Sequence, residues 1–140
     1  MWRLDPARVY VAGSSFGGHI SLLLAFRYPN VYVGAASLSG AFWPYEGTPQ
    51  SIFAETSGIG KVPVALFMDH GGTAADGADG YWPNLAMRDQ LVGMGWAQST
   101  APSCTPSDDS LCYFWDEGAA HDELAWKDRA HLFLRYFFAR

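Results

Sequence analysis

A serine, an aspartate and a histidine that could together perform nucleophilic catalysis occur in this order along the chain. Ser15 lies in the run Gly13-Ser14-Ser15-Phe16-Gly17, between an apolar stretch and a longer apolar stretch rich in leucine. This G-x-S-x-G pattern, after a strand and before a helix, is typical of a sharp turn that exposes a serine hydroxyl. A hydroxyl attacks well only when a base takes its proton and a third group orients that base. The pattern therefore predicts a nucleophile at Ser15.

Four histidines compete for the role of the base. His121 lies in a loop after the last predicted strand, which matches the chain order of serine, then aspartate, then histidine. His19 falls inside the first predicted helix, where a hydrogen-bonded core or surface histidine is the simpler interpretation. His70 and His131 have no matching position. We therefore expect His121 to accept the proton of Ser15.

Three aspartates lie in the Gly- and Asp-rich loop that follows the third predicted strand. Asp69 stands at the strand end, Asp76 in the middle of the loop, and Asp79 directly before the next helix. The loop has to reach sideways to the histidine, so we expect Asp79 to orient it. Asp76 is the alternative, and Asp69 is too close to the sheet. Asp122 and Glu123 are better explained as charges that stabilise a helix N-terminus.

The small residues around Ser15 have mechanical roles in this interpretation. Gly13 and Gly17 avoid a collision between strand and helix, and Gly18 allows close packing at the helix start. The backbone N–H of Phe16, at the helix N-terminus, can face the negative charge that develops on a substrate oxygen. The alternative is a plain turn in which Gly-Ser-Ser caps a helix.

Phe42 and Trp43 belong to an irregular segment, residues 41–57, after the second predicted strand. Ligands in open α/β sheets bind at the carboxyl ends of parallel strands, so we expect both rings to bind substrate. The alternative is that these rings only pack the loop against the protein. We expect no cofactor, and the sequence indicates no metal site.

Apolar runs alternate along the chain with stretches of helical periodicity. We predict strands at residues 9–12, 32–39, 62–68 and 111–115, and helices at about 16–28, 83–93 and from 122 onward. We predict a polar loop at residues 98–109. The alternation predicts an α/β fold with a parallel sheet of about four strands and flanking helices.

Parallel strands bring the loops that follow them to the same edge of the sheet. Ser15, Asp79 and His121 all lie in such loops, so their side chains can converge although they are far apart in sequence. The last helix has a buried face set by its spacing. That face consists of Trp126, Ala130, Phe133 and Phe137.

Length and composition limit the class of protein. The 140 residues suffice for one domain, residues 1–140, with one core. The net charge is −5 without a basic cluster, which argues against a nucleic-acid partner. No window is apolar enough to span a bilayer, so we expect a soluble chain, cytoplasmic, or secreted if a leader is missing. Cys104 and Cys112 are compatible with a disulfide or with two thiols.

These motifs resemble those of an esterase family of the α/β-hydrolases, which includes esterase D-like, enterochelin esterase-like and feruloyl esterase-like enzymes. The resemblance is carried by residues 5–18 (DPARVYVAGSSFGG), 27–29, 37–40, 42–43, 69–73, 79–81 and 121–126. It implies an α/β-hydrolase fold and a small-molecule ester as substrate. It also implies a nucleophile at Ser15, an acid at Asp79 and a base at His121. Asp122 is a small departure, because family members usually have asparagine or serine there.

Members of this family usually have several strands before the nucleophile strand, and a loop there that supplies a second oxyanion N–H. This chain begins almost at that strand, so it resembles the C-terminal half of such an esterase. Residues 9–12 would then form an exposed edge strand. An exposed edge favours self-association or pairing with a complementing N-terminal segment.

Three functions are consistent with these observations. The first is hydrolysis of a carboxylic ester through an acyl-enzyme on Ser15. The second is acyl transfer to an alcohol through the same intermediate, and the sequence does not separate the two. The third is a truncated, non-catalytic remnant that binds a partner or acts as a scaffold.

Overall fold

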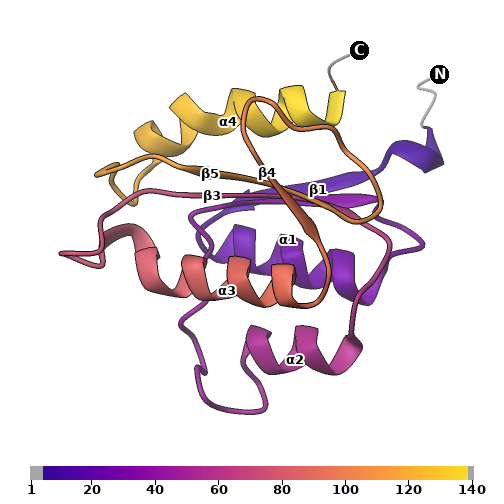
Figure 1. Ribbon diagram of the computed structural model, residues 1–140, viewed down its shortest axis with the longest axis horizontal. Helices are drawn as coiled ribbons and strands as arrows, with labels where there is room; N and C mark the ends of the chain where they lie inside the picture. Colours follow the sequence, from indigo (N-terminus) through magenta and orange to yellow (C-terminus); the bar gives the residue numbers. More distant parts are fainter. Residues whose placement is uncertain (1–4, 139–140) are drawn as a thin grey trace.

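Five strands pair in parallel to form the sheet at the centre of the fold (Figure 1). They are β1 (Tyr10–Ser14), β2 (Gly34–Leu38), β3 (Ala65–His70), β4 (Ala97–Thr100) and β5 (Ser110–Trp115), in the spatial order β1-β2-β3-β5-β4. This computed structural model describes residues 5–138. Every residue of β2 and β3 is buried, as expected for central strands of a sheet covered on both faces.

Helices cover both faces of this sheet. They are α1 (Phe16–Arg27), α2 (Ile52–Ile59), α3 (Tyr81–Gly93) and α4 (Glu123–Phe138), with short 3₁₀ turns η1 (Pro6–Arg8) and η2 (Ala78–Gly80). In Figure 1, α4 lies on one face, α1 and α3 lie on the other, and α2 lies outside these two. Within residues 5–138, no helix has the length and apolar character needed to cross a membrane.

The alternation of side chains along β3 builds two hydrophobic clusters, one on each face of the sheet. Leu66 and Met68 pack in a cluster with Phe26 of α1. Phe67 belongs to the other cluster, together with Leu132 of α4. All four residues predicted for the buried face of α4 belong to this second cluster, which confirms that prediction.

Two elements depart from the prediction. α2 begins within residues 41–57, where the Ser51 hydroxyl accepts a hydrogen bond from the Ala54 N–H at 3.2 Å, and it extends to Ile59. The polar segment 98–109 contributes most of β4, so the sheet has five strands rather than about four. β4 is an outer strand with mostly exposed residues. A strand of this kind needs no apolar pattern, and the periodicity therefore gives no signal there.

β1 is the outer strand at the other side of the sheet that residues 5–138 form. Its residues are exposed or half-buried, whereas those of its neighbour β2 are all buried. The expectation of an edge strand around residues 9–12 is therefore confirmed.

Cys104 and Cys112 form a disulfide. The structure thus decides between the two alternatives that the sequence left open. The bridge ties the loop after β4 to the adjacent strand β5.

Candidate active site

Ser15 occupies a sharp turn between β1 and α1. Its backbone has φ 54° and ψ −121°, and residues other than glycine rarely adopt a positive φ. The Ser15 N–H donates to the Leu38 carbonyl at 2.9 Å, and the Ser15 carbonyl accepts from His19 N–H at 3.2 Å and Ala41 N–H at 3.0 Å. These bonds tie the turn to the end of β2 and to the segment after it, so the serine is held in its strained conformation.

The glycines around this turn have different roles. A Cβ on Gly13 would lie 2.5 Å from the carbonyl carbon of Gly17, and one on Gly18 would lie 2.6 Å from the Ser37 hydroxyl. The predicted packing roles of these two glycines are confirmed. A Cβ on Gly17 would meet nothing within 4 Å, so the prediction that Gly17 avoids a collision through its own missing side chain is wrong. The Gly17 backbone lies so close to Gly13 that residue 13 has no room for a Cβ atom.

The Ser15 hydroxyl lies 2.9 Å from Nε2 of His121. The other ring nitrogen, Nδ1, lies 2.6 Å from Oδ1 of Asp79. A carboxylate only accepts hydrogen bonds, so Nδ1 carries the proton and Nε2 accepts from the serine. The three side chains come from the β1–α1 turn, from η2 and from the loop before α4, at the left end of Figure 1.

Asp79 is positioned by the backbone of its loop. Asp79 has φ 52°, and Gly77 and Gly80 on either side each have φ 64°. Aspartate tolerates this left-handed region better than most residues, and glycine adopts it without strain. The second carboxylate oxygen, Oδ2, accepts hydrogen bonds from the Ser39 hydroxyl at 2.6 Å and from the Gly71 N–H. The side chain is fully buried, and both oxygens have partners.

The other two candidate aspartates lie elsewhere, Asp76 in the loop and Asp69 in β3, which extends beyond the predicted residue 68 to His70. Asp76 is exposed, and its Oδ1 accepts from Ala78 N–H at 2.9 Å and Thr73 N–H at 3.0 Å. These backbone hydrogen bonds lower the pKa of Asp76. Asp69 is buried beneath the site and has no contact with His121. Asp79 is therefore the aspartate that contacts His121, whereas the alternative, Asp76, bonds backbone amides of its own loop.

The other histidines are engaged in structural contacts. His70 is buried, with Nε2 2.5 Å from the Tyr113 hydroxyl and Nδ1 2.8 Å from a backbone carbonyl. Burial lowers the pKa of His70 and raises the pKa of Tyr113 to about 12. His19 bonds the Ala41 carbonyl at 2.8 Å, and His131 bonds a carbonyl within its own helix. His121 is thus the histidine that meets Ser15.

Comparisons with known proteins identify the family of this chain. Residues 2–136 match the family described as Putative esterase. The chain belongs to this family. Over 79 residues it is 37% identical to poly(3-hydroxyalkanoate) depolymerase C of Paucimonas lemoignei, a match that covers 56% of this chain and 18% of that protein.

Solved structures of esterases share the fold. An enterobactin esterase of Shigella flexneri superposes with a TM-score of 0.63 at 22% identity, over 93% of this chain and 32% of that one. A ferulic acid esterase superposes with a TM-score of 0.64 at 15% identity, over 95% of this chain and 52% of that one. This member of the esterase family therefore spans about half, or less, of the length of these relatives.

The aromatic residues predicted to bind substrate have different environments in this esterase-family chain. Trp43 is 41% exposed, and its ring lies 6.0 Å from the ring of His121 in an edge-on arrangement. Phe42 is fully buried in the core. The prediction that Phe42 binds substrate is wrong, because its ring packs under the loop instead. Trp126 of α4 lies 5.0 Å from His121, so two tryptophans flank the histidine.

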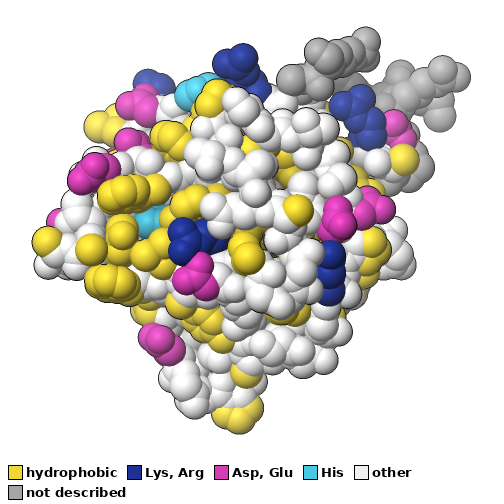
Figure 2. All heavy atoms as spheres, viewed as in Figure 1, with side chains coloured by type: hydrophobic (Ala, Val, Ile, Leu, Met, Phe, Trp, Pro, Cys, Tyr) yellow, Lys and Arg dark blue, Asp and Glu magenta, His cyan; other side chains and the backbone are white. Residues whose placement is uncertain are grey.

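Exposed hydrophobic side chains surround this end of the molecule. Figure 2 shows hydrophobic side chains gathered at the end of the molecule where η2 and the start of α3 lie. Phe16 is 61% exposed and Trp82 is 57% exposed. The rim of the candidate site is therefore apolar and aromatic.

Sequence reasoning missed two polar residues beneath the site. Arg129 of α4 is 2% exposed, and its Nη2 donates to the Ser39 hydroxyl at 2.8 Å. The available signal was the arginine's place at helical spacing between Trp126 and Phe133, on a face that is otherwise apolar. Ser39 directly follows β2 and has φ 46°, which no pattern in the sequence indicates.

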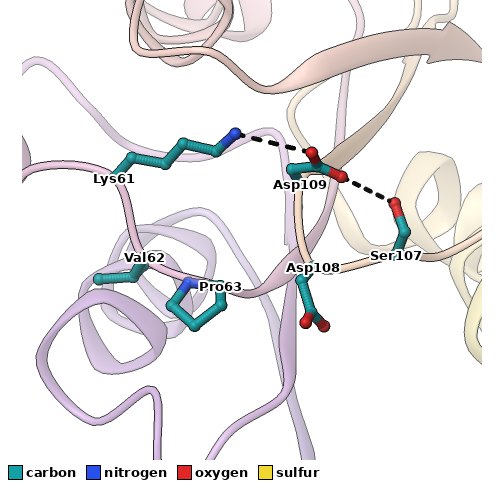
Figure 3. Close-up of a pocket in the computed structure, with 6 residues that line it drawn as sticks. All are labelled: Lys61, Val62, Pro63, Ser107, Asp108 and Asp109. Carbon is teal, nitrogen blue, oxygen red and sulfur yellow. Dashed lines mark hydrogen bonds and ion pairs between the residues drawn. The ribbon is translucent and has the colours of Figure 1, made fainter.

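A hollow lies at the opposite edge of the sheet, where the strands begin. It has a volume of about 700 Å³ and is lined by Lys61, Val62, Pro63, Ser107, Asp108 and Asp109. Lys61 Nζ lies 3.8 Å from Asp109 Oδ2, and Ser107 donates to the same aspartate (Figure 3). No histidine lines this hollow. Over residues 5–138, no group of three or more His, Cys, Asp or Glu side chains could hold a metal ion.

Proposed function

We propose that this chain carries the catalytic centre of a serine carboxylic-ester hydrolase. Ser15 is the nucleophile, His121 the base and Asp79 the acid that orients it. The observation that carries the proposal is the pair of contacts made by one imidazole, 2.9 Å to the Ser15 hydroxyl and 2.6 Å to the Asp79 carboxylate. Membership of an esterase family supports the same reaction class.

The first half of the reaction forms an acyl-enzyme. Ser15 Oγ attacks the ester carbonyl carbon while its proton passes to Nε2 of His121, and a tetrahedral oxyanion forms. The C–O bond to the alcohol then breaks, and the alcohol leaves with the proton from Nε2. Asp79 keeps the ring oriented and stabilises the imidazolium without taking its proton.

The second half releases the acid. A water molecule gives a proton to Nε2 and attacks the acyl carbon, and the second tetrahedral intermediate collapses to the free acid as Ser15 recovers the proton. Throughout, charge on the former carbonyl oxygen needs hydrogen-bond donors. Phe16 begins α1, so its N–H has no carbonyl one turn earlier in the helix to bind and can serve this purpose.

The surroundings of His121 support an ester with an apolar part. Trp43 is exposed beside the histidine, and Phe16 is exposed beside the nucleophile. Polar substrates would gain little from such a rim, whereas an apolar acyl or alcohol group would be removed from water there. We therefore propose Trp43 as a substrate contact.

Labelling with a fluorophosphonate tests this proposal directly, because the probe reacts covalently with an activated serine. We expect the probe to label the full chain at Ser15 and a p-nitrophenyl ester to be hydrolysed. Ser15→Ala should lose both activities, and the neighbouring Ser14→Ala serves as the matched control. A protein that folds and takes no label at Ser15 would exclude the proposed function. Adding an acceptor alcohol to the ester assay separates hydrolysis from acyl transfer.

A further inference from the structure

Arg129 places a positive charge in the interior, directly beneath the proposed triad. It comes from α4 and is 2% exposed. Its guanidinium faces three carboxylates, with Nε 3.2 Å from Asp69, Nη2 3.8 Å from Asp79 and Nη1 3.4 Å from Asp116. A buried cation is costly unless charges and hydrogen bonds compensate it. Arg129 takes no part in the proposed reaction steps.

The hydrogen bonds of Ser39 have only one possible direction. Arginine only donates and an ionised carboxylate only accepts. The Ser39 oxygen therefore accepts from Arg129 Nη2 at 2.8 Å, and its proton points to Asp79 Oδ2 at 2.6 Å. The arginine thus fixes a hydroxyl that would otherwise rotate. A continuous chain of contacts runs from Arg129 through Ser39, Asp79 and His121 to Ser15.

The hydrogen-bonding capacity of Asp79 Oδ2, the oxygen that does not contact His121, is used by these contacts. Oδ2 accepts from the Ser39 hydroxyl and the Gly71 N–H and faces the guanidinium, which leaves Oδ1 for His121. A fully buried carboxylate stays ionised only if such partners favour the charged form. The Arg129 guanidinium is a positive charge that faces Oδ2, the oxygen of Asp79 that does not contact the histidine.

We propose that Arg129 is a positioning residue of the triad: through its charge and through Ser39 it holds the Asp79 carboxylate oriented toward His121. This inference rests on the proposed function and deepens it. Arg129 acts through Asp79 and touches neither Ser15 nor the substrate.

The competing explanation is that Arg129 only neutralises Asp69. Asp69 is fully buried, and its Oδ2 and the Arg129 Nε face each other at 3.2 Å with an alignment too poor for a hydrogen bond. Asp69 Oδ1 accepts from the Ser39 N–H at 3.2 Å and from Arg129 Nη2 at 3.3 Å. Asp116 is 42% exposed and is therefore the weaker partner. The two explanations differ once Asp69 is replaced by an uncharged residue. A mere counter-ion to Asp69 would then have no effect on the triad, whereas a positioning residue would still act on Asp79.

The experiment therefore compares Asp69→Asn with the double variant Asp69→Asn/Arg129→Met, both in the full chain. The readout is the rate of fluorophosphonate labelling of Ser15 as a function of pH. If Arg129 positions the triad, we expect the double variant to label about tenfold more slowly than Asp69→Asn at neutral pH. The pH profile of labelling should also differ between the two variants, because the double variant lacks the charge that faces Asp79.

A second pair of variants keeps the inference testable if methionine disturbs folding. Asp69→Asn/Arg129→Lys retains the charge, so the pH profile of its labelling should match that of Asp69→Asn. Ser39→Ala removes the hydroxyl without removing a charge, and we expect it to slow labelling in the otherwise wild-type chain. Urea unfolding of each variant shows whether a slower rate reflects a smaller folded population.

The outcomes are separable. If the double variant matches Asp69→Asn in rate and pH profile, or if Ser39→Ala labels like the wild type, Arg129 is only a counter-ion and the inference fails. In that case the proposed function stands, because Ser15 is still labelled. If neither the wild type nor Asp69→Asn is labelled at Ser15, the proposed function fails and this inference fails with it.

Discussion

At the scale of single residues, the identity of the acid can be tested by two matched substitutions. Asp79 bonds His121 at 2.6 Å, whereas Asp76 bonds only backbone amides of its own loop. We expect Asp79→Asn to lower the turnover of a p-nitrophenyl ester by about four orders of magnitude, because the amide no longer fixes the required tautomer of the histidine. Asp76→Asn should keep most of the activity. Equal losses in the two variants would contradict the assignment of Asp79.

Asp69 leads to a prediction about stability. Burial raises the pKa of Asp69 from 3.8 to about 6, although Arg129 opposes this shift. The folded state therefore binds a proton more readily than the unfolded chain, and folding loses stability as the pH rises from about 4 to about 6. Measured against Asp69→Asn, we expect the free energy of unfolding of the wild type to fall by about 3 kcal/mol across this window. Urea titrations at several pH values measure the stability of the wild type relative to Asp69→Asn, and a wild type that becomes relatively more stable as the pH rises would refute the prediction.

At the scale of elements, the turn at Ser15 depends on how closely α1 crosses β1. A Cβ on Gly13 would lie 2.5 Å from the backbone of Gly17, so we expect Gly13→Ala to destabilise the protein by about 1–3 kcal/mol and to slow labelling of Ser15. Gly17→Ala places its methyl group in open space on the same helix. It should be neutral or stabilising by up to about 1 kcal/mol in urea unfolding. Similar losses in both variants would contradict this account.

The elements that could be predicted from the sequence are those whose buried face gives a regular spacing of apolar residues. The buried strand at β3 and the apolar face of α4 have such a pattern. β4 lies at an exposed edge with polar side chains, and α2 is only eight residues long, so neither leaves a clear period. Ser15 and His121 could be named because a motif and a chain order define them. Helical spacing places Arg129 on the buried face of α4. The contacts that Ser39 and Arg129 make with Asp79 depend on tertiary packing, which neither a motif nor a period encodes.

At the scale of the whole molecule, the free edge of β1 is a feature that the proposed catalytic site does not account for. β1 is an outer strand, and a groove of about 340 Å³ lies between it and α4. Ala12 of β1 lines this groove together with Trp126 and Phe133 of α4. Phe16 and Ile20 of α1 are also more than half exposed. A strand that has a neighbour on only one side and is flanked by apolar side chains is a template for pairing with another strand.

We therefore expect the 140-residue chain on its own to self-associate through β1, unless a complementing segment occupies that edge. Ala12→Lys places a charge on the exposed edge, so it should shift the molecular mass measured by light scattering toward that of the monomer. Ala97→Lys makes the same change on β4, the polar outer strand at the other side, and should leave the mass unchanged. Because the groove also reaches Ser14, next to the nucleophile, pairing at β1 should accelerate labelling of Ser15. A compact wild-type monomer that labels as fast as any assembly would show that β1 needs no partner.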